Sequence, residues 1–146
     1  MATFSRNATV NWQGPIMQGS GQAAAGTGAF DLPVTFPRRI GDPEGTTSPE
    51  ELIAAAHAVC YTMVINAAIG RKGGSIAKTQ VTCTVTADKG EAGIKITTSK
   101  LMLTVEGLAG MAASEFDAFA REAEKGCPVS NALRGNVAIE VETKVN

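Results

Sequence analysis

The sequence has little of several features on which whole classes of proteins depend. It contains a single histidine, His57, and three cysteines, with neither a CxxC pair nor a cluster of histidine and cysteine, so it shows no ligand set for a zinc site. Its 13 basic and 14 acidic residues nearly balance, and the electrostatic footprint of a nucleic-acid or anionic-membrane binder is therefore missing. We expect no metal, no nucleic acid and no membrane, and a neutral or weakly polar partner.

The sequence also lacks a secretion signal and a disulfide framework. Polar and apolar residues alternate over its first dozen positions, where a signal would have a charged start and a continuous apolar run. An odd number of widely spaced cysteines argues against structural disulfides. We therefore expect a cytoplasmic protein with free thiols. With 146 residues, of which 44% are hydrophobic, the chain is predicted to form one compact domain over residues 1–146.

One long run without charge, residues 52–70, approaches the length that spans a bilayer. It is rich in alanine and carries His57, Thr62 and Asn66, which are costly in hydrocarbon. The run is thus interpreted as a buried helix of a soluble protein. Because a helix that is apolar on nearly every side needs more cover than a short chain supplies, it also indicates a homodimer.

The pattern along the rest of the chain is typical of an α+β fold. Apolar alternation predicts strands, 3.6-residue periodicity predicts helices, and clusters of Pro, Gly and charge predict loops. The expected order is strands at residues 3–12, 17–24 and 30–34, a loop at 36–47, a helix from Pro49 to about Gly70, a strand containing Val81, Cys83 and Val85, a strand at 94–105, a helix at 114–125, a short helix from Cys127, and a strand over 137–145. The first strand is expected to be half-buried.

Three local signals refine this order. Ser48, Pro49 and Glu51 match an N-cap, a first helical position and a capping-box acid, which marks the start of the long helix. The turn between the two central strands is predicted at residues 88–90. Apolar residues change face within residues 94–105, which predicts a β-bulge.

The three cysteines differ in their settings. Cys60 lies in the middle of the long helix, where a lone cysteine usually behaves as a small hydrophobe. Cys127 follows Gly126 and precedes Pro128, so its sulfur lies at the start of a short helix whose dipole favours the thiolate. Cys83 alternates with valines in a strand, and core packing accounts for it. Position alone thus makes Cys127 the more informative thiol.

Two segments resemble the signature motifs of one family. TSPEELIAAAHAVCYTM at residues 47–63 and CPVSNALRG at residues 127–135 resemble those of the OsmC/Ohr organic hydroperoxide reductases, and EELIAAAHA is closer to the OsmC branch. The resemblance extends to the order of strands and helices. It implies an OsmC-like α+β fold with antiparallel sheets and a long buried central helix, in an intertwined homodimer with active sites at the subunit interface. It also implies a cysteine peroxidase for organic hydroperoxides, with an antioxidant role.

The resemblance also implies roles for particular residues. Cys60 would attack the peroxide and pass through a sulfenate, and Cys127 would resolve it as a Cys60–Cys127 disulfide. Glu50 and Arg39 match the family's glutamate and arginine beside the attacking thiol, with Arg38 as the alternative arginine. An external dithiol, lipoyl-linked by family analogy, would reset the enzyme, and no resident cofactor is implied.

The residues alone leave other interpretations open. Glu50 would also stabilise the helix dipole, and both arginines would also serve as solvated loop charges. His57 shares a helix face with Cys60, which allows a cysteine hydrolase or acyltransferase with His57 as base, although a satisfied buried histidine is favoured. A non-catalytic redox-sensing module is a further alternative.

Helix geometry constrains how Glu50 contributes to the site. Ten residues of α-helix span roughly 15 Å, too far for Glu50 to contact Cys60 of its own chain. Glu50 acts either through Arg39, folded back over the helix, or from the partner subunit, and we expect the latter. The apolar lining of the peroxide pocket is expected from neighbours in sequence, namely Tyr61, Met63, Phe36 and Ile40.

Overall fold

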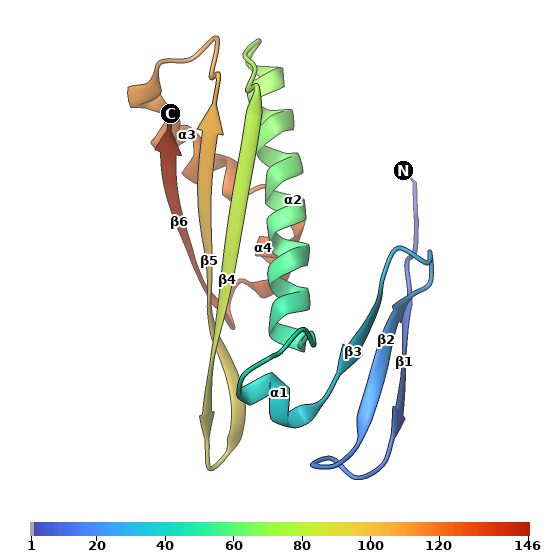
Figure 1. Ribbon diagram of the computed structural model, residues 1–146. Coiled ribbons are helices and arrows are strands. Elements are labelled where there is room, and N and C mark those ends of the chain that lie inside the picture. The colour runs from blue at the N-terminus through green and yellow to red at the C-terminus, as the bar shows by residue number, and fades with distance from the viewer. Residues whose placement is uncertain (1) are drawn as a thin grey trace. The chain divides into compact units, whose positions relative to one another are not determined.

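A computed structural model describes residues 2–146 and resolves two compact units, which meet in sequence between Pro49 and Glu50 (Figure 1). The elements are β1 (Ala8–Gln13), β2 (Ser20–Ala25), β3 (Asp31–Val34), α1 (Phe36–Ile40), α2 (Pro49–Arg71), β4 (Lys78–Gly90), β5 (Gly93–Glu106), α3 (Ala113–Glu124), α4 (Pro128–Leu133) and β6 (Ala138–Val145). The mixture of segregated helices and sheets confirms the α+β class. That the whole chain forms a single domain stays a prediction.

The N-terminal unit is an antiparallel sheet in the order β1-β2-β3, followed by α1. Its first strand begins at Ala8, later than predicted, and all of its residues are exposed, so the expectation of a half-buried strand is wrong for this chain. The alternation is real, but within residues 2–49 Ala23 is the only buried hydrophobic residue. A three-stranded sheet with so little buried surface is marginally stable without a covering layer.

The helix α1 lies within residues 36–47, which were predicted to be a loop. The Thr35 hydroxyl accepts a hydrogen bond from the Arg38 amide at 3.3 Å, and Pro37 lies in the first turn, where a proline is tolerated. This cap and proline start a helix, which was not predicted because the Pro and Gly residues of this segment indicated a loop. The remainder is a turn in which Glu44 and Gly45 both have positive φ.

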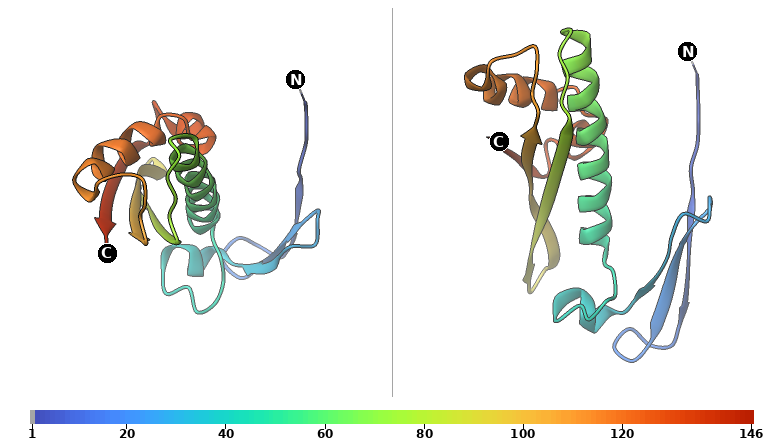
Figure 2. Two further views of the ribbon diagram at one scale, coloured as in Figure 1. Left: turned by 90° about the horizontal axis from the view of Figure 1, so that it is seen from above. Right: turned by 45° about the horizontal axis from the view of Figure 1, so that its top comes forward.

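The C-terminal unit packs helices α2 and α3 against one face of the sheet β4-β5-β6 (Figures 1 and 2). The pairing of β4 with β5 is antiparallel, as expected, but β6 runs parallel to β5, with Thr98 opposite Ala138. This sheet is therefore mixed rather than antiparallel throughout. The difference arises because α3 and α4 form a crossover between the two strands, and a crossover returns the chain in the same direction.

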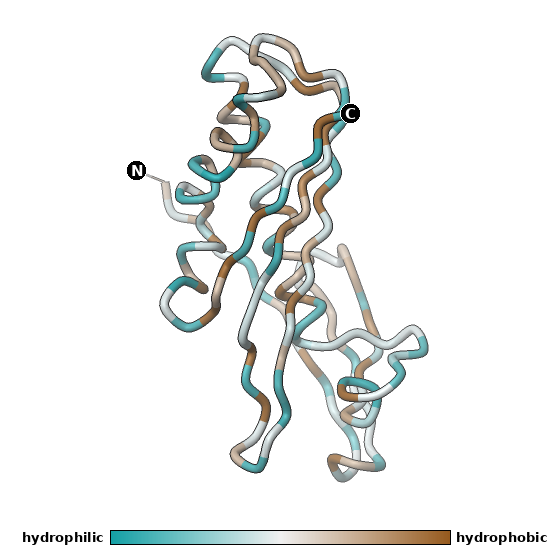
Figure 3. The backbone as a smooth tube through the Cα atoms, turned by 90° about the vertical axis from the view of Figure 1, so that its left-hand side faces the viewer, coloured by the Kyte–Doolittle hydropathy of each residue, from teal (hydrophilic) through white to brown (hydrophobic). Residues whose placement is uncertain are grey.

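The long strands carry the predicted bulge. Thr86 pairs with Thr98 and Ala87 pairs with Ile96, so Thr97 is the additional residue. Hydrophobic and hydrophilic residues alternate along these strands (Figure 3). The connecting turn lies at residues 91–92, beyond the predicted position, because β4 continues until Gly90 pairs with Gly93. Gly93 closes this hairpin at a φ of 118°, a conformation that favours glycine.

Helix α2 is buried along one side only, in agreement with the expectation that so short a chain cannot cover it on every side. Its buried residues are His57, Tyr61, Ile65, Ala68 and Ile69. Val59 and Met63, on another side, are 55% and 68% exposed. The helix is long and apolar enough to cross a membrane by composition, yet Tyr61 and Ile65 belong to the core of this unit. The rest of that core comes from the sheet, α3 and the start of α4: Leu101, Leu103, Val105, Phe116, Ala120, Cys127 and Val141.

Candidate active site

Two cysteines from distant parts of the sequence meet in the C-terminal unit. Cys60 lies on α2, and Cys127 is the N-cap residue of α4, as the Gly-Cys-Pro sequence predicted. The Cys127 side chain and the Val129 backbone both lie near enough to the Cys60 sulfur to shift its pKa. Both cysteines are free thiols. The fold thus makes two reduced cysteines neighbours.

The two thiols differ in access to solvent. Cys60 is partly exposed and lines an open groove of about 550 Å³, whereas Cys127 is 0% exposed. The groove is lined by Cys60, Met63, Val64, Ala67, Ala68, Arg71, Glu122, Ala123, Gly126 and Pro128. A small molecule in this groove therefore meets Cys60 before Cys127.

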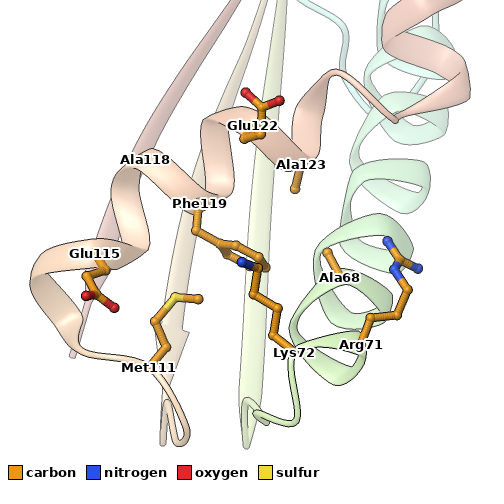
Figure 4. A pocket seen from close by; sticks show the side chains of 9 residues that line it. All are labelled: Ala68, Arg71, Lys72, Met111, Glu115, Ala118, Phe119, Glu122 and Ala123. Atoms are coloured by element: carbon orange, nitrogen blue, oxygen red, sulfur yellow. The ribbon is translucent and has the colours of Figure 1, made fainter.

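The groove continues between α2 and α3 (Figure 4). This second part, of about 600 Å³, shares Ala68, Arg71, Glu122 and Ala123 with the part at Cys60 and adds Lys72, Met111, Glu115, Ala118 and Phe119. The Lys72 ammonium lies 5.8 Å from the centre of the Phe119 ring. The combined groove has apolar walls with charged side chains among them.

The structure separates the expected lining residues. Met63 does line the groove at Cys60, but Tyr61 does not, because its side chain is 0% exposed and its hydroxyl donates a 2.8 Å hydrogen bond to the Ala120 carbonyl. Burial also raises the Tyr61 pKa. Phe36 and Ile40 lie on α1 in the other unit, and their contribution stays a prediction.

The electrostatic setting of Cys60 favours the neutral thiol. Burial raises its pKa, and the Cys127 side chain raises it further, while the Val129 amide lowers it. Reaction with a peroxide requires the thiolate. The surroundings of Cys60 described for this unit therefore oppose its ionisation, an effect that a cation near the sulfur would offset.

The expected cation and its acidic partner lie elsewhere in the chain. Arg39 is in α1 of the N-terminal unit, and the guanidinium of its neighbour Arg38 forms an ion pair with Glu44. Glu50 lies in the first turn of α2, and the unbroken helix separates it from Cys60 by roughly 15 Å. Glu50 is not among the residues that line the groove at Cys60. The approach of Arg39 and Glu50 to a reacting thiol stays a prediction.

A buried polar network surrounds His57, which confirms the interpretation of a satisfied histidine. Its Nδ1 lies 2.6 Å from the Ser99 hydroxyl and its Nε2 lies 2.6 Å from the Ser130 hydroxyl, and all three residues are 0% exposed. Burial lowers the His57 pKa. The Cys83 sulfur lies 3.2 Å from the Ser99 hydroxyl, so Cys83 hydrogen-bonds as well as packs. No local pattern indicated these partners, because the serines lie 42 and 73 residues from His57.

Known proteins share this sequence and fold. The family model described as OsmC-like protein matches residues 41–142. Peroxiredoxin OsmC from Escherichia coli (strain K12) is 34% identical over 143 residues, which cover 97% of this chain and 99% of the relative. Organic hydroperoxide resistance protein OhrA from Bacillus subtilis (strain 168) is 32% identical over 126 residues, which cover 84% of this chain and 86% of the relative.

A solved structure agrees with these sequence relatives. The crystal structure of an organic hydroperoxide resistance protein OsmC from Legionella pneumophila superposes with a TM-score of 0.75 at 27% identity and covers 99% of this chain and 100% of that chain. The fold, the adjacent thiols and these relatives define a cysteine-based peroxidase. The chain belongs to the family of OsmC-like proteins, as its two motifs predicted.

Proposed function

We propose that the protein reduces organic hydroperoxides to alcohols, with Cys60 as the attacking thiol and Cys127 as the resolving thiol. The observation that carries this proposal is the pair of neighbouring thiols of which only Cys60 lines the groove. The mainly apolar lining of the groove suits an organic peroxide better than hydrogen peroxide. The names of the OsmC and OhrA relatives agree with this activity.

The proposed reaction has three steps. The Cys60 thiolate attacks the distal oxygen of ROOH, so an S–O bond forms as the O–O bond breaks, and the alkoxide takes up a proton and leaves as ROH. The Cys127 sulfur then attacks the Cys60 sulfenic acid, which forms the disulfide and releases water. An external dithiol, of the lipoyl class by family analogy, reduces the disulfide by thiol–disulfide exchange.

Arg39 and Glu50 have supporting roles in this proposal. Arg39 supplies the positive charge that offsets the raised pKa of Cys60, and Glu50 of the partner subunit orients that guanidinium bidentately.

The proposal includes a homodimer in the cytoplasm. The exposed apolar side chains of β1 and α2, among them Val10, Trp12, Val59 and Met63, support a covering partner of the same kind. Three free cysteines are typical of a reducing compartment.

The rival hydrolase mechanism loses support from the histidine geometry. A hydrolase would use a ring nitrogen of His57 to deprotonate Cys60, but the two nitrogens are held by Ser99 and Ser130. That mechanism also gives Cys127 no task. A redox sensor without turnover would use the same two thiols, so sustained turnover distinguishes it from the enzyme.

The test combines mass spectrometry with the Cys127→Ser variant. One equivalent of cumene hydroperoxide should convert the wild-type protein to a Cys60–Cys127 disulfide and leave Cys83 unmodified. Cys127→Ser should consume the first equivalent, stop at an oxidised Cys60 and lose sustained turnover with a dithiol, while Cys83→Ser should keep turning over. Undiminished peroxidase turnover by Cys127→Ser would contradict the proposal, as would ester hydrolysis without peroxide consumption.

A further inference from the structure

We propose that His57 is a positioning residue that docks α4 against α2, so that Cys127 closes the disulfide before Cys60 is oxidised a second time. This inference rests on the proposed peroxidase cycle and assigns a residue to its second step. His57 does not touch the peroxide in this scheme. It acts through Ser130, which lies in the short helix α4 whose N-cap residue is Cys127.

The first part of the evidence is the place of His57 on α2. It lies three residues before Cys60 and so on the same face of the helix. Its Nε2 bonds the hydroxyl of Ser130, three residues after Cys127 and next to Val129, whose backbone lies near enough to Cys60 to lower its pKa. The His57–Ser130 hydrogen bond therefore joins the helix that carries one thiol to the helix that is capped by the other.

The second part is the way the imidazole ring itself is held. The bond from Nδ1 to Ser99 ties the ring to β5, so the ring is fixed on both sides. A neutral imidazole has one donor and one acceptor nitrogen, and a serine hydroxyl serves as either, so both bonds form in either tautomer. Among residues 2–146, no buried side-chain nitrogen or oxygen lacks a hydrogen-bond partner. An apolar residue at position 57 would leave both serine hydroxyls without their hydrogen bond to the ring. This loss is unfavourable because both serines are 0% exposed.

A separate contact holds the other end of α4. Arg134, which follows the helix, forms an ion pair with the largely buried Glu124 at the end of α3. This pair involves neither thiol and remains when the His57–Ser130 bond is removed. Loss of that bond should therefore displace the Cys127 end of α4 while the helix stays attached.

Displacement matters because two reactions compete for the sulfenic acid. In closure, Cys60–SOH and Cys127–SH give the disulfide and water. In overoxidation, Cys60–SOH and a second ROOH give the sulfinic acid and ROH, which a dithiol does not reverse. Closure between held groups is sensitive to displacements of about 1 Å, which cost up to about 100-fold in rate. Docking by His57 thus favours closure over overoxidation.

The experiment measures both steps in full-length variants with cumene hydroperoxide. Stopped-flow fluorescence or rapid chemical quench measures the rates of peroxide attack and of disulfide closure separately. Mass spectrometry gives the fraction of Cys60 in the sulfinic form at rising peroxide concentration. Ser130→Ala and His57→Leu should slow closure about 10- to 100-fold, with a smaller change in the attack rate and a larger sulfinic fraction. His57→Gln, whose amide reaches toward Ser130, should recover much of the closure rate. Ser99→Ala, which frees one side of the ring but leaves the Ser130 bond in place, should slow closure less than Ser130→Ala does.

The outcomes separate this inference from the proposed function. A wild-type protein that forms no Cys60–Cys127 disulfide would overturn the peroxidase cycle itself. If the wild type closes normally and folded Ser130→Ala closes equally fast, the positioning role is wrong. It is also wrong if Ser130→Ala slows attack and closure by the same factor, since that indicates a general disturbance of the site. Ser130→Ala removes a single hydroxyl and keeps the test valid if His57→Leu does not fold.

Discussion

At the level of single residues, the burial of His57 should make the folded protein sensitive to acid. Burial lowers the pKa of the imidazole below its ordinary value of 6.5. As the pH falls below about 6.5, the unfolded chain takes up a proton that the folded protein does not. The free energy of unfolding should therefore decrease from about pH 6.5 down to the lowered pKa, by at most about 1.4 kcal/mol per pH unit from this group.

Urea unfolding at pH 7.5, 6.5 and 5.5 checks this expectation. Carboxyl groups also titrate toward acid pH, so the relevant quantity is the difference in pH dependence between the wild type and His57→Gln, which cannot ionise. The wild type should lose more stability than the variant on acidification. Because His57 is the only histidine, its titration can be followed in parallel by NMR. A His57 pKa at or above 6.5, or equal slopes for the two proteins, would contradict the prediction.

The individual site residues differ in how far the sequence could predict them. The helix start at Cys127 follows from Gly126 and Pro128, which are local signals. The adjacency of Cys60 and Cys127 came only from the family resemblance, because it depends on the crossover that brings α4 back to α2. The partners of His57 depend on the same long-range packing, and serine is too common in proteins for its position to indicate a buried contact.

At the level of elements, the length of α2 makes a prediction about Glu50. The helix keeps Glu50 and Cys60 of one chain roughly 15 Å apart, so Glu50 should complete the site of the partner subunit. Cys60→Ser and Glu50→Gln homodimers should both be inactive or weakly active toward cumene hydroperoxide. A mixed dimer of the two variants should regain activity, because Glu50 of the Cys60→Ser chain and Cys60 of the Glu50→Gln chain together form one complete site.

The matched control for this mixture is a dimer in which one chain carries both substitutions and the other carries none. It contains the same substitutions as the mixed dimer. If Glu50 acts across the interface, one of its sites lacks Cys60 and the other lacks Glu50. That control should therefore be weakly active. Activity in the control and none in the mixed dimer of single variants would show that Glu50 acts within its own chain.

Features that carry a local sequence signal were predicted well, whereas features that depend on how the chain is connected were not. The start of α2 at Pro49 and the bulge at Thr97 follow from capping chemistry and from a change of apolar face. The parallel pairing of β6 with β5 departs from the expected antiparallel sheets, because pairing direction depends on the connection through α3 and α4 and not on the alternation within the strand. The helix α1 was missed because its proline indicates a loop as readily as a helix start.

At the level of the whole molecule, the exposed side of β1 should stabilise the homodimer. Val10 and the neighbouring Asn11 are both exposed, but they point to opposite faces of the strand. Val10→Lys should weaken association because it places a charge on the apolar face, whereas Asn11→Lys should have little effect. Analytical ultracentrifugation over a range of concentrations measures both. A monomeric wild type, or equal association of both variants with the wild type, would contradict the expectation.

The same face of β1 carries Trp12, two residues after Val10 and 37% exposed. It is the only tryptophan in the chain, and its indole N–H donates a 2.8 Å hydrogen bond to the Gly14 carbonyl. An indole that moves from water into an apolar contact emits at shorter wavelength, so assembly should give a colour shift that needs no added dye. The protein thus contains an optical reporter on the N-terminal sheet, in a different unit from Cys60 and Cys127, with which subunit exchange could be timed while the thiols stay reduced.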